Sequence, residues 1–405
     1  MEDILDVFEE PAPPAPSQRA FTGSLYAQGT FPRSTPSAPP IYRTQGGVRR
    51  PQHIIDIDIR LRAATTSAEL LHVVEDSISR FDIGNAVIAF ACAAKLDQGQ
   101  EMATLDSSPA WPLLQEQLLS CAEKLEPRGM SMVAYAAARL MWGNEMLLNG
   151  LARCGARRSC DFGATDIAKG CWAFSKLRFV SQPLAVDFWK AMSQEAPRVV
   201  RSARFVDVSM MAWAFAITGN VNTAFFDEVA KATRITCDTL TPRSLASISW
   251  SCASAKYVDR RLLAEIGRRA TDVVHEFGAH DISALCWAFA VLNEANLQLF
   301  DALASHAVEG NIIHSLGPSL AAELAWAFAA VGMRHDRLLE ELETLCAANI
   351  NDLETEDVAG FAWAFMKLGR SRNSQAMRAI SVYAKRFAGR IRPIEHRLLD
   401  WALDS

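Results

Sequence analysis

Several motifs that would indicate a catalytic or metal-binding protein are missing from this sequence of 405 residues. No cysteine pair has C-x-x-C spacing, and neither the nine cysteines nor the eight histidines form a metal-ligand pattern, so we expect no metal site. A phosphate-binding glycine loop and kinase-type HRD and DFG motifs are absent. No Ser–His–Asp or Cys–His set can be proposed from spacing. We therefore expect no catalytic residue, no cofactor and no enzymatic activity.

The sequence also lacks a long apolar run and an excess of positive charge. No stretch approaches the roughly 18 uninterrupted apolar residues of a spanning helix, which predicts no membrane insertion. Lysine and arginine number 41 against 46 acids, a formal net charge of −5, whereas most nucleic-acid-binding proteins have an excess of basic residues. Half of the residues are hydrophobic, enough to bury a large core, so a wholly disordered chain is excluded.

The N-terminal segment over residues 1–52 has the composition of a disordered tail. It is rich in proline and serine, with PAPPAP at residues 11–16, and cannot bury enough apolar surface to offset its ordering entropy. From Pro11 to His53 it contains arginines but no acid, which is also typical of organellar transit peptides. Two interpretations stay open, a flexible linker and a targeting signal.

A repeat runs through the rest of the chain. The triplet Trp-Ala-Phe occurs five times, and Trp250 fills the gap between the second and third copies. Consecutive tryptophans of this set are 41, 37, 37, 39 and 37 residues apart, and the pattern continues upstream to a tyrosine and an alanine. We call these residues the anchors and count other positions from the anchor of the same repeat. The anchors are Ala91, Tyr135, Trp172, Trp213, Trp250, Trp287, Trp326 and Trp363.

The sequence around each anchor is typical of an amphipathic helix. Four repeats have an acid at position −6, which indicates a helix start because its carboxylate can cap free backbone amides. A second amphipathic segment follows a short turn, as in LLAEIGRRA from Leu262. One hairpin cannot cover its own apolar face, but stacked neighbours can. The sequence therefore predicts an all-α fold, an α-solenoid of about eight helix–turn–helix repeats with a period near 38 residues.

The pattern also divides the chain. We predict the disordered tail over 1–52, an N-terminal helical cap over 53–81, the solenoid over 82–390 and a C-terminal capping helix over 391–405. The anchor tryptophans could stack on nucleic-acid bases, but their alanine neighbours and strict spacing favour packing between hairpins.

The anchor-bearing helix resembles the octotricopeptide repeats of the RAP and FAST-kinase-like family of organellar RNA-binding proteins. The matching segments are DIAKGCWAFSKL, DVSMMAWAFAIT, DISALCWAFAVL and DVAGFAWAFMKLG, and the resemblance covers roughly residues 61–390. It implies binding of single-stranded or ribosomal RNA in a mitochondrion or plastid, with a role in RNA processing, stability or translation. Many members end in a RAP domain with nuclease-like features. No such module is seen before Ser405, which favours a non-enzymatic protein.

Clustered basic residues are the candidate RNA contacts. Two groups of three arginines fall at equivalent places in consecutive repeats, so we expect them to form one cationic strip. Lysines at positions −3 and +4 share one helix face. The alternative is an ordinary solvated helix end, where cations also suit the dipole. The predicted RNA-binding residues are Arg153, Arg157, Arg158, Lys169, Lys176, Arg198, Arg201, Arg204 and Lys367.

The expected partner is RNA, together with other proteins of an organellar ribonucleoprotein. The alternative function is a protein–protein interaction scaffold or a subunit of a larger assembly that uses the same solenoid, and the net charge of −5 favours it. The expected location is a mitochondrion or plastid, with the cytoplasm as the alternative.

Overall fold

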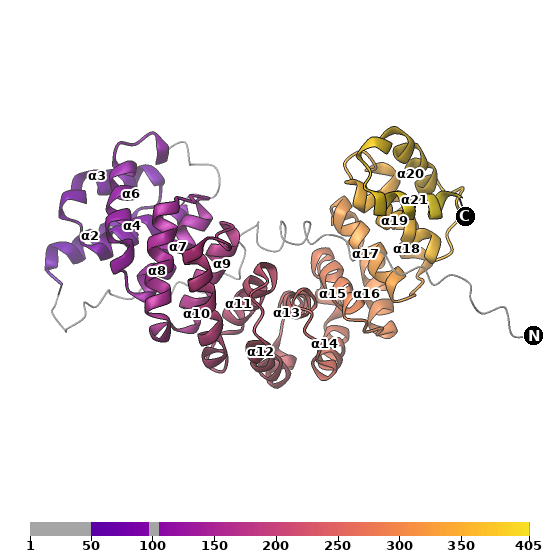
Figure 1. Cartoon of the computed structure of the whole chain (residues 1–405), viewed down its shortest axis with the longest axis horizontal. Helices are drawn as coiled ribbons and strands as arrows, with labels where there is room; N and C mark the ends of the chain where they lie inside the picture. Colours follow the sequence, from indigo (N-terminus) through magenta and orange to yellow (C-terminus); the bar gives the residue numbers. More distant parts are fainter. Residues whose placement is uncertain (1–49, 97–104, 405) are drawn as a thin grey trace, which may run out of the picture. The chain divides into compact units, whose positions relative to one another are not determined.

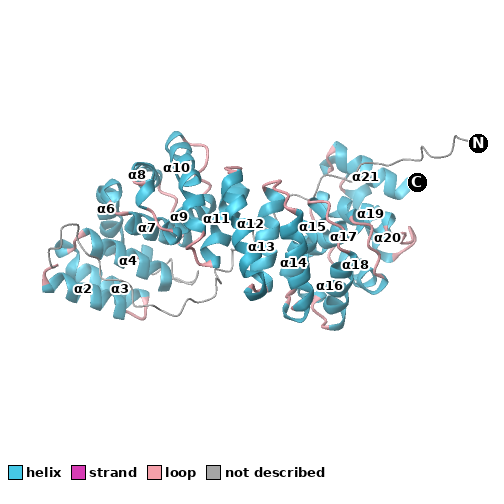
Figure 2. Cartoon of the chain, turned by 90° about the horizontal axis from the view of Figure 1, so that it is seen from below, coloured by secondary structure: helices cyan, strands magenta, loops and turns pink. Residues whose placement is uncertain are grey.

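The structure is a computed structural model that describes residues 50–96 and 105–404. These residues contain nineteen α-helices, seven short 3-10 helices and no strand (Figures 1 and 2). Neighbouring helices pack in a repeating arrangement, so the prediction of an all-α solenoid is confirmed. The described residues divide into an N-terminal unit over 50–232 and a C-terminal unit over 233–404. The predicted tail lies outside the described residues, except for positions 50–52.

In the N-terminal unit, two cap helices precede four hairpins, each made of an anchor-bearing A helix and a B helix. The cap helices are α2 (Gln52–Ala63) and α3 (Ser67–Ser77). The A helices are α4 (Ile83–Leu96), α7 (Pro127–Arg139), α9 (Ala164–Lys176) and α11 (Phe205–Thr218). The B helices are α6 (Ala110–Cys121), α8 (Glu145–Arg157), α10 (Pro183–Val200) and α12 (Thr223–Thr236), which contains the division between the units.

The C-terminal unit contains four further hairpin repeats and a final helix. Its A helices are α13 (Pro242–Ser254), α15 (Ala279–Val291), α17 (Pro318–Ala330) and α19 (Thr355–Lys367). Its B helices are α14 (Arg260–Asp272), α16 (Leu297–Glu309), α18 (Asp336–Ala348) and α20 (Gln375–Arg386). The final helix, α21 (Pro393–Asp404), packs against α19 as a further A helix would. With the four hairpins of the N-terminal unit, the repeats number eight, as predicted.

Within each unit, the A helices are buried because they pack on one another and on the B layer. The phenylalanine at position +2 makes the contact with the B layer: the ring centroids of Phe174 and Phe188 are 4.3 Å apart, and those of Phe328 and Phe300 are 5.0 Å apart. The six anchor tryptophans are at most 4% exposed. The anchors therefore fill the space between hairpins, which is the packing role favoured by their spacing.

The turn between the A and B helices has the same backbone form in seven repeats. Position +6 has a positive φ in each, the left-handed conformation in which a side chain is strained. Three repeats have glycine there and four do not. The residues and their φ values are Met141 (51°), Arg178 (55°), Gly219 (72°), Lys256 (54°), Asn293 (54°), Gly332 (70°) and Gly369 (73°).

The acids at position −6 do not cap their own helices, so this part of the sequence prediction is wrong. The N-cap residue of α9 is Gly163, which has no side chain to accept a hydrogen bond, and that of α11 is Arg204, whose side chain accepts none from the backbone. The acids lie in the first turn, where three of them accept a hydroxyl hydrogen bond from the preceding A helix of the stack. These bonds are Ser131 to Asp166 (2.9 Å), Thr165 to Asp207 (2.9 Å) and Ser319 to Asp357 (2.7 Å).

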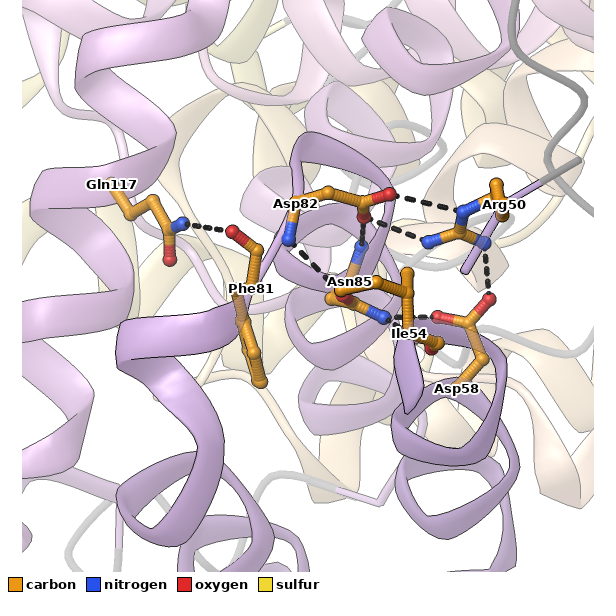
Figure 3. Close-up of polar contacts among 7 residues, drawn as sticks. All are labelled: Arg50, Ile54, Asp58, Phe81, Asp82, Asn85 and Gln117. Carbon is orange, nitrogen blue, oxygen red and sulfur yellow. Dashed lines mark hydrogen bonds and ion pairs between the residues drawn. The ribbon is translucent and has the colours of Figure 1, made fainter. Parts of the chain in front are cut away.

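A buried polar network holds the N-terminal cap to the first hairpin (Figure 3). The Arg50 guanidinium lies between two carboxylates, donating to Asp58 at 2.6 Å and to Asp82 at 2.7 and 3.0 Å. The Asn85 side-chain amide donates to Asp58 at 2.5 Å and to the Ile54 carbonyl at 3.2 Å. Because the Arg50 charge is buried and paired on both sides, the network fixes α2 against the start of α4.

Candidate functional site

One face of each A helix points away from the B layer. Position +2 contacts the B layer, and an α-helix turns about 100° per residue, so the anchor lies about 160° away from that contact. Positions −7, −3 and +4 lie within about 60° of the anchor on the same side. We call the four positions −7, −3, 0 and +4 the anchor face.

Three successive A helices of the N-terminal unit have a cation at position +4 of the anchor face. These residues, which we call the basic stripe, are Lys95 on α4, Arg139 on α7 and Lys176 on α9. Helix α7 packs against both α4 and α9, so the three positions are neighbours. None of the three side chains makes a hydrogen bond or ion pair with a described residue. They are therefore available to a ligand.

The helix dipole does not explain the basic stripe. Cations are favourable in the last turn of any helix, yet only one of the four A helices of the C-terminal unit has a cation at +4. The residues there are Ser254, Val291, Ala330 and Lys367. The stripe is therefore a property of the N-terminal unit and not of the repeat.

Lys169, at position −3 of α9, extends the stripe toward the middle of the helix. Its Nζ lies 5.6 Å from the centroid of the Tyr135 ring, a cation–π contact. Burial lowers the pKa of Lys169, although Asp166 and Asp207 attract its charge. Burial also lowers the pKa of Lys176. Partly desolvated ammonium groups without an ion pair gain electrostatic stabilisation when a phosphate approaches.

Two aromatic anchors accompany these cations. The ring centroids of Tyr135 and Trp172 lie 5.0 Å apart. Tyr135 is half-buried, whereas Trp172 is only 4% exposed. The indole Nε1 of Trp172 is buried and makes no hydrogen bond within the described residues. Tyr135 is thus the aromatic side chain of this face that is open to a ligand, and it lies beside the ammonium of Lys169.

All six arginines of the predicted cationic strip are paired with acids of the same unit. Six positive charges thus meet five negative ones, so the strip has little net charge to offer a phosphate. Arg153 and Arg157 contact Glu123, Arg158 contacts Asp161, Arg198 contacts Glu195, Arg201 contacts Glu228 and Arg204 contacts Asp207. The Arg201 and Lys231 side chains lower the pKa of Glu228 to about 2.

One arginine of the second group, Arg198, reaches the turn that follows the first group. Arg198, near the end of α10, donates from Nη2 to the carbonyls of Cys160 and Phe162 at 3.2 and 3.0 Å. Those carbonyls belong to the segment between α8 and α9, which contains the 3-10 helix Ser159–Asp161. Arg198 therefore ties α10 to the segment that leads into α9, a structural role that the sequence did not show.

The remaining predicted contact, Lys367, belongs to the C-terminal unit. It is exposed and makes no hydrogen bond or ion pair with a described residue. The other eight predicted residues belong to the N-terminal unit.

A depression of about 580 Å³ lies at the start of α15 and α17 in the C-terminal unit. Its lining combines Arg243 and His280 with Asp281, so it has no uniform charge. The backbone at Gly278 and Gly317 precedes the two helices there. Two helix N-termini and an arginine favour an anion, while Asp281 opposes it.

Sequence reasoning missed three cations of the N-terminal anchor face. Lys95 and Arg139 are at +4 and Arg128 is at −7, and none of the three is paired with a described residue. The signal was present, because the register that selected Lys169 and Lys176 also applies to the repeats anchored by tyrosine and alanine.

Within residues 50–96 and 105–404, no group of three or more His, Cys, Asp or Glu side chains could hold a metal ion. None of the helices in these residues has both the length and the apolar composition needed to cross a membrane.

Comparison with known proteins gives a family match. The family model described as RNA-editing substrate-binding complex 6 protein matches residues 187–392, just over half of the chain. The match begins in α10 and ends before α21, so it includes most of the C-terminal unit and leaves α4, α7 and α9 outside. No curated protein matches the sequence.

Proposed function

We propose that this chain, which belongs to the RNA-editing substrate-binding complex 6 protein family, binds RNA through the anchor face of its N-terminal unit. The family description connects the fold with RNA editing and with a complex, which supports both RNA and protein as partners. The observation that carries the proposal is the basic stripe, Lys95, Arg139 and Lys176, whose cations are unpaired with described residues on three neighbouring helices.

The chemistry of this face suits a single strand. Unpaired lysines and arginines neutralise backbone phosphates and release counterions, which gives affinity without base specificity. Tyr135, half-buried beside Lys169, offers a ring on which an unstacked base can stack. Bases in a duplex are already stacked on each other, so this arrangement favours single-stranded RNA over a duplex.

The finer role that we propose is non-enzymatic. The chain holds RNA and presents it to other subunits for processing, stabilisation or translation in a mitochondrion or plastid. The resemblance of the A helices to octotricopeptide repeats supports the organellar location, and the lack of catalytic motifs in the sequence supports a binding role. The alternative is a scaffold that binds only proteins, and the ion-paired state of the six strip arginines favours it.

The test compares two matched sets of four substitutions in the full chain. The anchor-face set is Lys95→Gln, Arg139→Gln, Lys169→Gln and Lys176→Gln, and the control set is Arg153→Gln, Arg157→Gln, Arg201→Gln and Arg204→Gln. Binding of a fluorescein-labelled single-stranded RNA of mixed sequence is measured over a range of salt concentrations, with the same RNA in duplex form as a comparison.

We expect the anchor-face set to weaken binding of the single strand at least tenfold and the control set to change it little. Each lost phosphate contact should reduce the salt slope by about 0.7. If the wild-type chain does not bind RNA, or if the anchor-face set binds as wild type does, the proposal is wrong. If only the control set loses binding, the RNA site is the predicted arginine strip.

Two further measurements test the finer role. A tagged full-length chain should co-fractionate with mitochondria or plastids, and a purely cytoplasmic signal would contradict the organellar location. Labelled RNA incubated with the purified chain and magnesium should stay intact, and cleavage that tracks with the chain through purification would contradict a non-enzymatic role.

A further inference from the structure

The C-terminal unit contains a buried carboxyl group that has no hydrogen-bond or ion-pair partner. Glu323, at position −3 of α17, is 3% exposed. Its carboxyl group makes no hydrogen bond and no ion pair with a described residue. Burying a carboxylate without a partner is costly, and proteins normally pair such a group. Nothing in the packing of the helix requires it, because the same position holds a methionine in α11 and an alanine in α15.

The side chains that act on Glu323 electrostatically are themselves acidic. Asp357, at position −6 of α19, is 6% exposed and accepts a hydrogen bond from Ser319. Glu356, at position −7, pairs with Arg392 at 2.8 Å. Burial, together with these two carboxyl groups, raises the pKa of Glu323 well above its ordinary value. The site is therefore one that a cation would stabilise.

At the equivalent position of the N-terminal unit the residue is a cation instead of an acid. Lys169 is at position −3 of α9, and the acid at −6 of the next A helix, Asp207, attracts its charge. In the C-terminal unit the pair Glu323 and Asp357 has the same register, but both members are acidic. The register that places Asp207 near Lys169 in the N-terminal unit therefore places two carboxyl groups, Glu323 and Asp357, near each other in the C-terminal unit.

The helix that packs against α17 has a glycine at the position equivalent to Glu323. The neighbouring −3 position, on α19, is Gly360, and a Cβ built there would meet no other atom within 4 Å. Helices α17 and α19 pack directly against each other, and Glu323 and Gly360 occupy the same repeat position on these two helices. We call Glu323, Asp357, Glu356 and the space above Gly360 the acidic recess.

We propose that the acidic recess binds a cationic side chain, an arginine of a protein partner. A guanidinium group has five planar donors and can bind a carboxylate through two parallel hydrogen bonds. It would meet two buried carboxyl groups, Glu323 and Asp357, neither of which forms an ion pair with a described residue. Glu356 at the edge of the recess is already paired with Arg392. The phosphates of RNA would be repelled there, so charge complementarity selects a basic protein segment.

This inference does not depend on the RNA site, which belongs to the other unit. The two sites are assigned by different residues, and each can fail alone. Residue 323 also lies within the region that matches the family model, whose description names a complex.

The experiment uses the full-length chain and a small probe. Acetyl-arginine amide is titrated at constant ionic strength, and stabilisation against thermal unfolding is compared with that given by neutral acetyl-citrulline amide. A ligand that binds only the folded chain raises the unfolding temperature in a saturable way. The variants are Glu323→Gln, Gly360→Leu and, as a control, Glu340→Gln, which changes an exposed acid on α18.

We expect the arginine derivative to stabilise the wild-type and Glu340→Gln chains more than citrulline does. Glu323→Gln should abolish the difference between the two probes. Gly360→Leu should abolish it too while leaving Glu323 in place, because leucine fills the opening. Gly360→Ala, a matched control with a shorter side chain, should keep most of it.

Two results would overturn the proposal. One is a wild-type chain that responds equally to both probes, and the other is a Glu323→Gln chain that still distinguishes them. RNA binding by Glu323→Gln is measured in parallel and should equal that of wild type. If Glu323→Gln instead loses RNA binding, the acidic recess belongs to the RNA site, and its assignment to a protein partner is wrong.

Discussion

The hydroxyl group of Thr165 donates a 2.9 Å hydrogen bond to Oδ2 of Asp207, joining α9 to the next A helix of the stack. The same two repeat positions, −7 and −6, are joined by the 2.7 Å bond from Ser319 to Asp357 in the C-terminal unit. The contact between neighbouring repeats is therefore polar as well as apolar, and its partners lie about 40 residues apart in the sequence.

The two bonds should differ in their contribution to stability. Ser319→Ala should lower the free energy of unfolding by about 1–3 kcal/mol, because Asp357 is buried and has no cation to replace the hydroxyl. Thr165→Val should cost only about 1 kcal/mol, since Asp207 keeps its 3.0 Å contact with Arg204. Urea unfolding of both variants measures the difference. Equal losses would show that the arginine does not compensate.

The left-handed turn at position +6 predicts opposite effects for two substitutions of glycine by alanine. Gly332 has a φ of 70°, so Gly332→Ala should destabilise the chain by about 1 kcal/mol even though a Cβ there meets no atom within 4 Å. Gly360→Ala is in a helix with equally open space and should stabilise it by about 0.5–1 kcal/mol. Lys256→Gly, at +6 of another repeat, should also stabilise the chain, because Lys256 has a φ of 54° that glycine adopts without strain. Thermal unfolding of the three variants checks the signs, and a destabilised Lys256→Gly would contradict the strain argument.

Arg198 should matter to folding more than the other strip arginines. Arg198→Gln removes the hydrogen bonds to the Cys160 and Phe162 carbonyls and should cost about 1 kcal/mol. Arg201→Gln breaks only the ion pair between the exposed Arg201 and Glu228, so its effect should be smaller. Chemical unfolding of the two single variants gives the comparison. Similar stability of both variants would mean that the two carbonyl contacts contribute nothing.

Glu323 should make stability depend on pH in a defined direction. Its pKa is raised in the folded chain, so the folded state keeps a proton that the unfolded state has lost above about pH 4.5. Wild type should therefore lose stability relative to Glu323→Gln as the pH rises from about 4.5 to the folded-state pKa, and the difference should then stay constant. Denaturation of both chains across pH, with Asp357 and Glu356 present in each, measures this term. A difference that does not change with pH would contradict the burial of an unpaired carboxyl group.

The fold could be predicted because each repeat contains its main determinant, a large aromatic anchor flanked by alanines, within a short stretch of sequence. A large aromatic residue such as Trp172 or Trp326, flanked by alanines at a constant interval, can be buried at one place only in a stack of hairpins. The role of the acids at −6 was not predictable in this way. An acid such as Asp207 near a helix start is consistent with a cap, and only the position of the neighbouring helix shows that it accepts from a threonine instead.

The candidate site could be predicted only in part. Register alone selects Lys169 and Lys176, and the same register applied to the tyrosine-anchored repeat would have added Arg139. The arginine strip was predicted from charge density, but acids from other helices, such as Glu228, pair with it. Whether a charged side chain is free depends on partners that are distant in sequence. Both the pairing of the arginines and the isolation of Glu323 therefore required the structure.

Because several A helices carry one half of a polar contact with the next A helix, the repeats of this chain are not interchangeable. The repeat that contains Lys169 is followed by one with an acid at −6, whose charge attracts the lysine, whereas the repeat that contains Glu323 is followed by one whose acid at −6 repels the glutamate. Shuffling, duplicating or deleting a hairpin would therefore change the charge balance at two junctions even where the apolar packing survived. The charged residues at the junctions between A helices therefore help to determine the order of the hairpins.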